Sequence, residues 1–186
     1  MRTLIVTAFV SLDGVMDSPG GGDHRSTGWT YQGIEFDPAA YEIKGREQEE
    51  STAMLLGRQS YEEFAPVWPS MEDFAGYNAM PRYVVSSTLQ QDDPRWPATI
   101  LRSTDDVAAL KETEGGHVIV HGSARLGQSL ADAGLVDRYH LLVFPVLLGA
   151  GKRLFSETDK ERTDLRLVEH QAYPNGIQKQ VFDVVR

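Results

Sequence analysis

The stretch "VIVHGSARLGQSLADAG", Val118–Gly134, decides the fold, because it passes from a buried strand through a tight turn into a helix. Isoleucine and valine residues predict the strand, and Leu126, Leu130 and Ala133 share one face of the helix. Gly134 is a typical helix stop. A strand that leads directly into a helix is characteristic of α/β domains built on a parallel sheet.

The turn in this stretch resembles a phosphate-binding P-loop but lacks the lysine. From Gly122 the sequence reads "GSARLGQS", whereas a P-loop reads G-x-x-x-x-G-K-[S/T]. Gln128 occupies the lysine position and cannot supply the positive charge that β- and γ-phosphates need. Hydrolysis of ATP or GTP is therefore disfavoured. Two interpretations of the turn stay open, an anion-binding corner and a simple strand-to-helix connection.

The rest of the chain alternates strands and helices and then ends in strands alone. This order predicts an α/β fold of three layers: a mainly parallel central sheet, helices on both faces and an antiparallel C-terminal hairpin. One domain is expected over residues 1–186. The expected strands are Thr3–Ser11, Thr52–Leu56, Arg82–Thr88, Ala98–Ser103, His117–Gly122, Val136–Leu148, Leu165–Tyr173 and Ile177–Val185.

Helix signals lie between these strands. Asp37 is a good cap for a helix that begins at Pro38, and the later part of that helix, "REQEES", is expected to face solvent. A second helix is expected over Gly57–Phe64, and prolines end that segment. A third is expected over Ser103–Thr113, with its serine as cap.

Composition excludes several classes of protein. The formal net charge is −9, which disfavours a general nucleic-acid binder. Cysteine is absent, so disulfides, thiolate zinc sites and cysteine nucleophiles are excluded. No histidines are spaced as metal ligands, and no metal is expected. The apolar run at the N-terminus is too short to span a membrane. A cytoplasmic protein without membrane contact is the expectation.

Three strand ends carry small or polar residues where the chain turns: "LLGRQS", "VVSST" and "VHGSAR". Ligands of parallel sheets bind beyond the carboxyl ends of the strands, so these ends predict one continuous cleft. Arg58 and Arg125 add positive charge at two of them. Each feature alone is more often structural, but all three fall at equivalent places in the fold.

The ordered motifs resemble the dihydrofolate reductase-like superfamily. The similar segments are "SLDG", "LLGRQSYEEF", "RYVVSSTL", "VIVHGSARLGQSLADAGLVDRYHLLVFPVLLGAGKRLF" and the closing hairpin, which together run from the first strand to the last. The resemblance is strongest to the branch of the pyrimidine reductase of riboflavin biosynthesis and its stand-alone relatives. That enzyme is often fused to a zinc deaminase, which needs cysteine ligands that this chain lacks.

The resemblance implies an oxidoreductase that uses NADPH. Gly57 and Arg58 match the glycine and arginine beside the cofactor phosphates, and Ser86 and Ser87 match the serines beside the ribose phosphate. The family's glycine-rich turn and its arginine correspond to four consecutive residues: Gly122, Ser123, Ala124 and Arg125. Arginines and serines without an acidic residue favour the 2′-phosphate of NADPH over NADH.

The proton donor for such a reduction is less evident. The helix after the first loop offers Asp37 and Glu42, and neither aligns cleanly with the acid of dihydrofolate reductases. Asp13 in "SLDG" matches the family's acidic residue; it either contacts substrate or stabilises the turn with Gly14, and both readings stay open. Hydride transfer itself asks little of the protein beyond orientation and electrostatics.

Two functions from different classes follow. The first is an NADPH-dependent reductase of a small heterocyclic substrate, a ribosylamino-pyrimidine or a pterin-like ring. The alternative is a non-catalytic nucleotide-binding or dimerisation module with the same fold. The family resemblance also implies a homodimer, formed through the sheet edge or the long strand.

Overall fold

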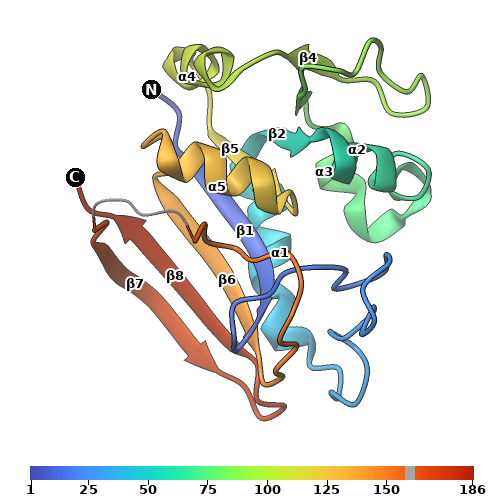
Figure 1. The fold of residues 1–186 in the computed structure, drawn as a ribbon, viewed down its shortest axis with the longest axis vertical. Helices are drawn as coiled ribbons and strands as arrows, with labels where there is room; N and C mark the ends of the chain where they lie inside the picture. Colours follow the sequence, from blue (N-terminus) through green and yellow to red (C-terminus); the bar gives the residue numbers. More distant parts are fainter. Residues whose placement is uncertain (158–161) are drawn as a thin grey trace.

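One eight-stranded sheet organises the molecule, which the computed structural model describes over residues 1–157 and 162–186. The strand order is β4-β3-β2-β5-β1-β6-β8-β7. The pairs among the first six strands are parallel, and β8 runs antiparallel to both neighbours (Figure 1). The mainly parallel sheet and its antiparallel C-terminal hairpin are thus confirmed. The strands are β1 (Leu4–Ser11), β2 (Ser51–Gly57), β3 (Arg82–Val85), β4 (Thr99–Leu101), β5 (His117–His121), β6 (Arg138–Phe144), β7 (Leu165–Ala172) and β8 (Gln178–Val184).

Helices cover both faces of the sheet, as predicted. One face buries Val6 and Val120 beneath α4 (Thr104–Glu112) and α5 (Ala124–Asp132). The other face buries Ile5 and Leu142 beneath α1 (Pro38–Glu50), α2 (Arg58–Phe64) and α3 (Ala75–Ala79). Successive side chains of a strand point to opposite faces, so a sheet covered twice needs apolar residues at both parities. Figure 1 shows α5 in front of the sheet and α1 behind it.

Helix caps appear at the predicted residues. The Asp37 side chain accepts a hydrogen bond from the backbone N–H of Ala39 at the start of α1. At the start of α4, Ser103 and Asp106 form a reciprocal capping box. These side chains satisfy backbone donors that the first helical turn leaves unpaired. In the described part of the chain, no helix is long and apolar enough to cross a membrane.

Helical structure also occurs where the sequence analysis expected none. Two 3₁₀ turns, η1 (Trp68–Ser70) and η2 (Glu72–Phe74), lead into α3. Stacked rings hold this segment together: the Phe64 and Trp68 centroids lie 4.3 Å apart, and those of Trp68 and Phe74 lie 4.4 Å apart. Such short turns depend on packing rather than on a periodic pattern.

Two other expectations were wrong in detail. The strand expected over Val136–Leu148 ends at Phe144, because Pro145 has no N–H to donate to a neighbouring strand. The segment "REQEES" of α1 does not face solvent throughout, since Glu47 is only 2% exposed. Its carboxylate lies against the sheet and finds polar partners there.

Candidate functional site

The turn between β5 and α5 has an unusual backbone. Gly122 and Ser123 both lie in the left-handed region, with φ of 60° and 61°. A side chain at Gly122 would place its Cβ 3.3 Å from the Phe64 ring, so the position suits glycine in space as well as in conformation. Ser123 adopts a conformation that glycine favours, and such strain in a non-glycine residue is common at functional sites.

Ser123 ties two neighbouring strand ends together. Its Oγ accepts a hydrogen bond from the backbone N–H of Gly57 (2.9 Å) and donates one to the carbonyl of His121 (3.1 Å). Its own N–H donates to Oγ of Ser60 (3.0 Å). The ends of β2 and β5 are thus held side by side, as expected for a cleft at the carboxyl edge of the sheet. Ser60 belongs to this site but was not predicted; its only signal is its place in "LLGRQS".

The two arginines of the predicted cofactor site differ in their surroundings. Arg58 pairs with Glu62 one helical turn away, Nη1 to Oε2 at 2.9 Å, and both side chains are about half exposed. Arg125 is exposed, and no described residue pairs with its guanidinium group. The N-terminus of α5 has no side-chain cap among the described residues. An unpaired cation beside an uncapped helix N-terminus is a favourable environment for an anion.

The two serines after β3 have separate roles. Ser86 is buried, and its Oγ accepts hydrogen bonds from the N–H groups of Thr88 (3.2 Å) and Leu89 (2.9 Å), so it shapes the turn. Ser87 is exposed. Arg102, which was not predicted, donates to the carbonyls of Ser86 (3.0 Å) and Leu89 (2.7 Å). It brings a positive charge to the serine turn from the end of β4.

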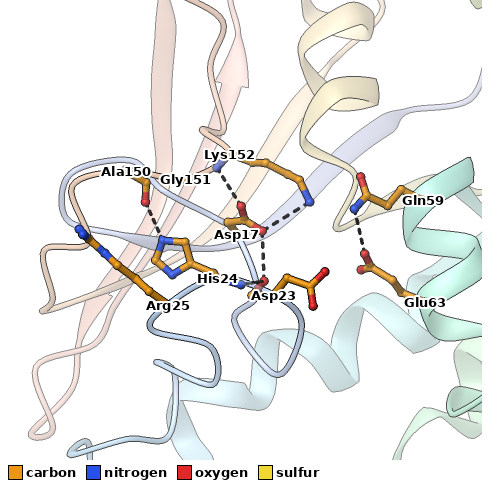
Figure 2. Close-up of a pocket in the computed structure, with 10 residues that line it drawn as sticks. Asp17, Asp23, His24, Arg25, Gln59, Glu63, Ala150, Gly151 and Lys152 are labelled. Atoms are coloured by element: carbon orange, nitrogen blue, oxygen red, sulfur yellow. Dashed lines mark hydrogen bonds and ion pairs between the residues drawn. The ribbon is translucent and has the colours of Figure 1, made fainter.

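A cavity of about 450 Å³ opens beside α2. Figure 2 shows the loop after β1 crossing towards residues 150–152, with Gln59 and Glu63 of α2 on the opposite side. His24 Nε2 lies 2.7 Å from the carbonyl oxygen of Ala150, and Lys152 Nζ lies 3.4 Å from Oδ1 of Asp17. Both positively and negatively charged side chains therefore line the cavity. Its lining residues are Asp17, Ser18, Asp23, His24, Arg25, Gln59, Glu63, Ala150, Gly151 and Lys152.

The three predicted acids have different surroundings. Asp13 accepts hydrogen bonds from the Ser11 hydroxyl (2.7 Å) and from the N–H groups of Leu148 (3.1 Å) and Gly149 (2.7 Å). These bonds lower the pKa of the Asp13 carboxyl to about 2, the Ser11 hydroxyl having the largest effect. Asp13 thus joins two loops, and its contact with substrate stays a prediction. Asp37 caps α1, and Glu42 is exposed.

The sequence matches one known family. A sequence model of the RibD C-terminal domain matches residues 2–179, almost the whole chain. The chain belongs to the RibD C-terminal domain family.

The chain is also similar to other proteins and to solved structures. Two proteins of Bacillus subtilis (strain 168) are similar to this chain. Uncharacterized protein YyaP is 28% identical, over 69% of this chain and 72% of YyaP. Uncharacterized protein YwjB is 27% identical, over 67% of this chain and 70% of YwjB. A putative riboflavin biosynthesis protein from Shewanella sp. PV-4 has a TM-score of 0.80 at 17% identity and covers 99% of both chains. A pyrimidine reductase-like protein from Corynebacterium diphtheriae has a TM-score of 0.67 at 14% identity, over 99% of this chain and 92% of that one. These structures share the RibD-like fold.

In this RibD C-terminal domain, a buried polar network lies between α1 and the sheet, and the sequence analysis missed it. The Glu47 carboxylate accepts hydrogen bonds from Thr7 Oγ1 (2.7 Å), His140 Nδ1 (2.9 Å) and the Tyr77 hydroxyl (2.8 Å). Lys44 Nζ lies 3.3 Å from its Oε2 and also donates to the Thr7 hydroxyl. Three of the four partners of Glu47 lie 30 to 93 positions away in the sequence, so no local pattern could reveal these contacts.

Charge balance sets the ionisation of this network. Burial alone would raise the pKa of the Glu47 carboxyl. The Lys44 ammonium and the His140 and Thr7 hydrogen bonds outweigh burial, and they lower that pKa to about 2. Burial lowers the pKa of Lys44, and Glu47 opposes that change. Glu47 is therefore an anion at neutral pH, with a lysine beside it whose proton is held less firmly than on an exposed lysine.

Proposed function

We propose that this protein is an NADPH-dependent reductase that transfers a hydride to a small heterocyclic substrate of the ribosylamino-pyrimidine or pterin type. The observation that carries the proposal is the Arg125 guanidinium, which no described residue pairs with, beside the N-terminus of α5, which no described side chain caps, at the carboxyl edge of a RibD-type sheet. A dinucleotide needs such a place for its pyrophosphate.

The described residues fit this cofactor. Arg125 and the first N–H groups of α5 would hold the pyrophosphate, and Ser87 and Arg102 would face the ribose phosphate. Arg58 would join them once it leaves Glu62. Arginine binds phosphate through paired N–H groups, which supports the 2′-phosphate of NADPH over NADH. When bound, the cofactor supplies the hydride; the chain supplies orientation, charge and exclusion of water.

A binding experiment tests the cofactor assignment. Titration of the protein with NADPH, followed by cofactor fluorescence, should give saturable binding, and NADH should bind more weakly. Arg125→Ala should weaken NADPH binding by about tenfold, the equivalent of roughly 1.4 kcal/mol. Arg162→Ala is the matched control, since Arg162 is exposed and pairs with Asp164 near the hairpin. Equal loss in both variants, or no binding by the wild type, would contradict the proposal.

Turnover separates the two candidate functions. A reductase oxidises NADPH in the presence of a phosphoribosylamino-uracil or of dihydrofolate, and absorbance of the reduced nicotinamide reports the rate. One observation favours a non-catalytic nucleotide-binding module instead. The Gly57 N–H donates its hydrogen bond to the Ser123 hydroxyl, whereas a glycine at that position would leave this N–H available to a phosphate. That alternative predicts NADPH binding without turnover of any acceptor.

A further inference from the structure

Stability alone does not explain why the Lys44–Glu47 network is buried. Desolvation of two charges costs several kcal/mol per ion, and well-packed apolar residues often replace a buried ion pair without loss. The neighbourhood is apolar enough for such a replacement: Lys44 Nζ lies 5.0 Å from the centroid of the Phe9 ring, and Tyr77 packs within the core. Perturbed ionisable groups that persist in such a place are candidates for function.

Lys44 is the outermost member of the network. Its side chain is 13% exposed, whereas that of Glu47 is fully buried and that of His140 is 5% exposed. Glu47 therefore lies behind Lys44 and is already bonded to three hydroxyl or imidazole donors. Of the side chains in this network, that of Lys44 is the most accessible from solvent, and its ammonium carries protons that it can donate.

The network extends to the candidate cofactor site through the sheet. Thr7 is in register with His121 of β5 on one side and with His140 of β6 on the other. In a parallel sheet, residues in register point to the same face. His121 immediately precedes Gly122, the first residue of the turn proposed to bind pyrophosphate. His121, Thr7 and His140 thus form a row on one face of the sheet. Thr7 in this row contacts Lys44, and His121 at its end adjoins that turn.

One ring nitrogen of His121 lacks a hydrogen-bond partner among the described residues. Its Nδ1 is buried and has no hydrogen-bond partner in the described part of the chain, although the residue as a whole is partly exposed. The rings of Phe64, Trp68 and Tyr77 meet it edge-on, with centroids 4.9 to 6.2 Å away. Burial lowers its pKa to about 3, so the ring is neutral. Buried polar atoms are nearly always paired, and an unpaired one marks where a ligand or water belongs.

From this arrangement we infer that Lys44 Nζ donates the proton to the substrate in the proposed reduction, and that His121 binds a polar edge of the same substrate. Glu47, Thr7 and His140 are positioning residues that hold the ammonium over Phe9. The inference rests on the proposed function and names a proton donor other than Asp13, Asp37 and Glu42, the three acids expected from the sequence.

The step balances for a C=N substrate. The hydride forms a new C–H bond at carbon, the π electron pair of C=N moves to nitrogen, and an N–H bond forms there as one N–H bond of Lys44 breaks. Lys44 is left as a neutral amine and regains a proton from solvent. General acids in enzymes contribute about 10² to 10⁴ in rate.

Two substitutions at Lys44 test this role. Lys44→Met removes the proton and the charge. Lys44→Arg keeps the charge beside Glu47, but a guanidinium group does not release a proton near neutral pH. Both variants should bind NADPH within about twofold of the wild type yet reduce dihydrofolate or a phosphoribosylamino-uracil about 10² times more slowly. They should also lose the alkaline limb of the pH–rate profile that deprotonation of Lys44 causes.

Lys111→Met is the matched control. Lys111 is also buried and also ion-paired, Nζ to Oδ2 of Asp137 at 2.6 Å, but it belongs to α4 on the other face of the sheet. This variant should unfold at lower temperature and keep the rate and pH profile of the wild type. If Lys44→Met does not fold by circular dichroism, Lys44→Arg carries the test.

A second readout needs no turnover. The chain has five lysines, so the ε-CH₂ signals of isotope-labelled lysine can be followed individually by NMR, and Lys44→Met identifies one of them. The Lys44 signal should titrate at lower pH than the other four and lower still in Glu47→Gln. His121→Phe should weaken substrate binding, seen as a higher KM, with NADPH affinity unchanged.

The outcomes separate the two proposals. A wild type that neither binds NADPH nor reduces either acceptor overturns the proposed function and this inference with it. A wild type that turns over while Lys44→Arg keeps its rate and pH profile overturns the inference alone. An unshifted Lys44 titration also overturns it, because an ordinary lysine at this place would be held too firmly protonated to act as the acid.

Discussion

At the scale of single residues, Ser123 determines how closely a phosphate can approach the β5–α5 turn. Its hydroxyl accepts the Gly57 N–H, and its backbone has a positive φ. Ser123→Gly should free that N–H and tighten NADPH binding by about tenfold, or roughly 1.4 kcal/mol. Relief of the left-handed strain and loss of the hydrogen bonds are each about 1 kcal/mol, so the melting temperature should change little. Fluorescence titration and thermal unfolding measure the two effects.

Ser129→Gly serves as the control for that substitution. Ser129 is exposed on the same helix, and its hydroxyl bonds only to the carbonyl of Arg125 in the described part of the chain. A glycine there should destabilise the helix by about 0.5 kcal/mol and leave NADPH affinity as it is. Weaker binding by Ser123→Gly would mean that the serine hydroxyl itself contributes to the phosphate site.

At the scale of elements, α1 is held to the sheet by the Glu47 carboxylate, and this contact should depend on pH. The folded-state pKa of Glu47 is about 2, below its ordinary value of 4.5. Its contribution to stability is therefore complete above about pH 4.5 and is lost as pH falls through about 2. Glu47→Gln should cost about 3 kcal/mol at neutral pH, where it leaves buried donors and Lys44 without their anion. The difference in unfolding free energy between this variant and the wild type should become steadily smaller as the pH falls.

Urea unfolding at neutral pH and at two acidic pH values measures that change. Glu169→Gln is the comparison, because Glu169 is also paired, with Arg46 and Lys179, but its side chain is 34% exposed. Its loss should cost no more than about 1 kcal/mol. If Glu47→Gln lowers the free energy of unfolding by the same amount at every pH, packing of the amide causes the loss of stability, and the loss of charge does not.

The helices and strands differ in how far the sequence predicts them. The caps Asp37 and Ser103 act within three residues, so they and the buried strands could be read directly. The position of the ends of β2, β3 and β5 at one edge of the sheet followed from the rule that parallel strands share their carboxyl edge, whereas the strand order itself was not predicted. Burial of Glu47 could not be read, because its partners Thr7 and His140 come from other strands. The helical turns over residues 68–79 depend on ring stacking, which leaves no periodic signal.

At the scale of the whole molecule, the sheet ends in an exposed strand. β7 is the last strand in the order, and it leaves Leu165, Leu167 and Val168 between 39% and 48% exposed. An edge strand with unpaired backbone groups and apolar side chains tends to pair with another chain. We propose that a second copy of this chain covers this edge, which gives the homodimer that the family resemblance implies.

Sedimentation velocity of the purified protein measures the assembly directly. The wild type should sediment as a dimer at micromolar concentration, and Leu167→Lys should shift it to the monomer with an unchanged circular dichroism spectrum. A lysine on an edge strand opposes pairing through its charge and its hydration. Val67→Lys is the control: Val67 is 50% exposed just after α2, which lies on β2 and β3 and not on β7, so its replacement should leave the dimer intact. If the wild type sediments as a monomer, or if both variants dissociate equally, β7 is not the interface.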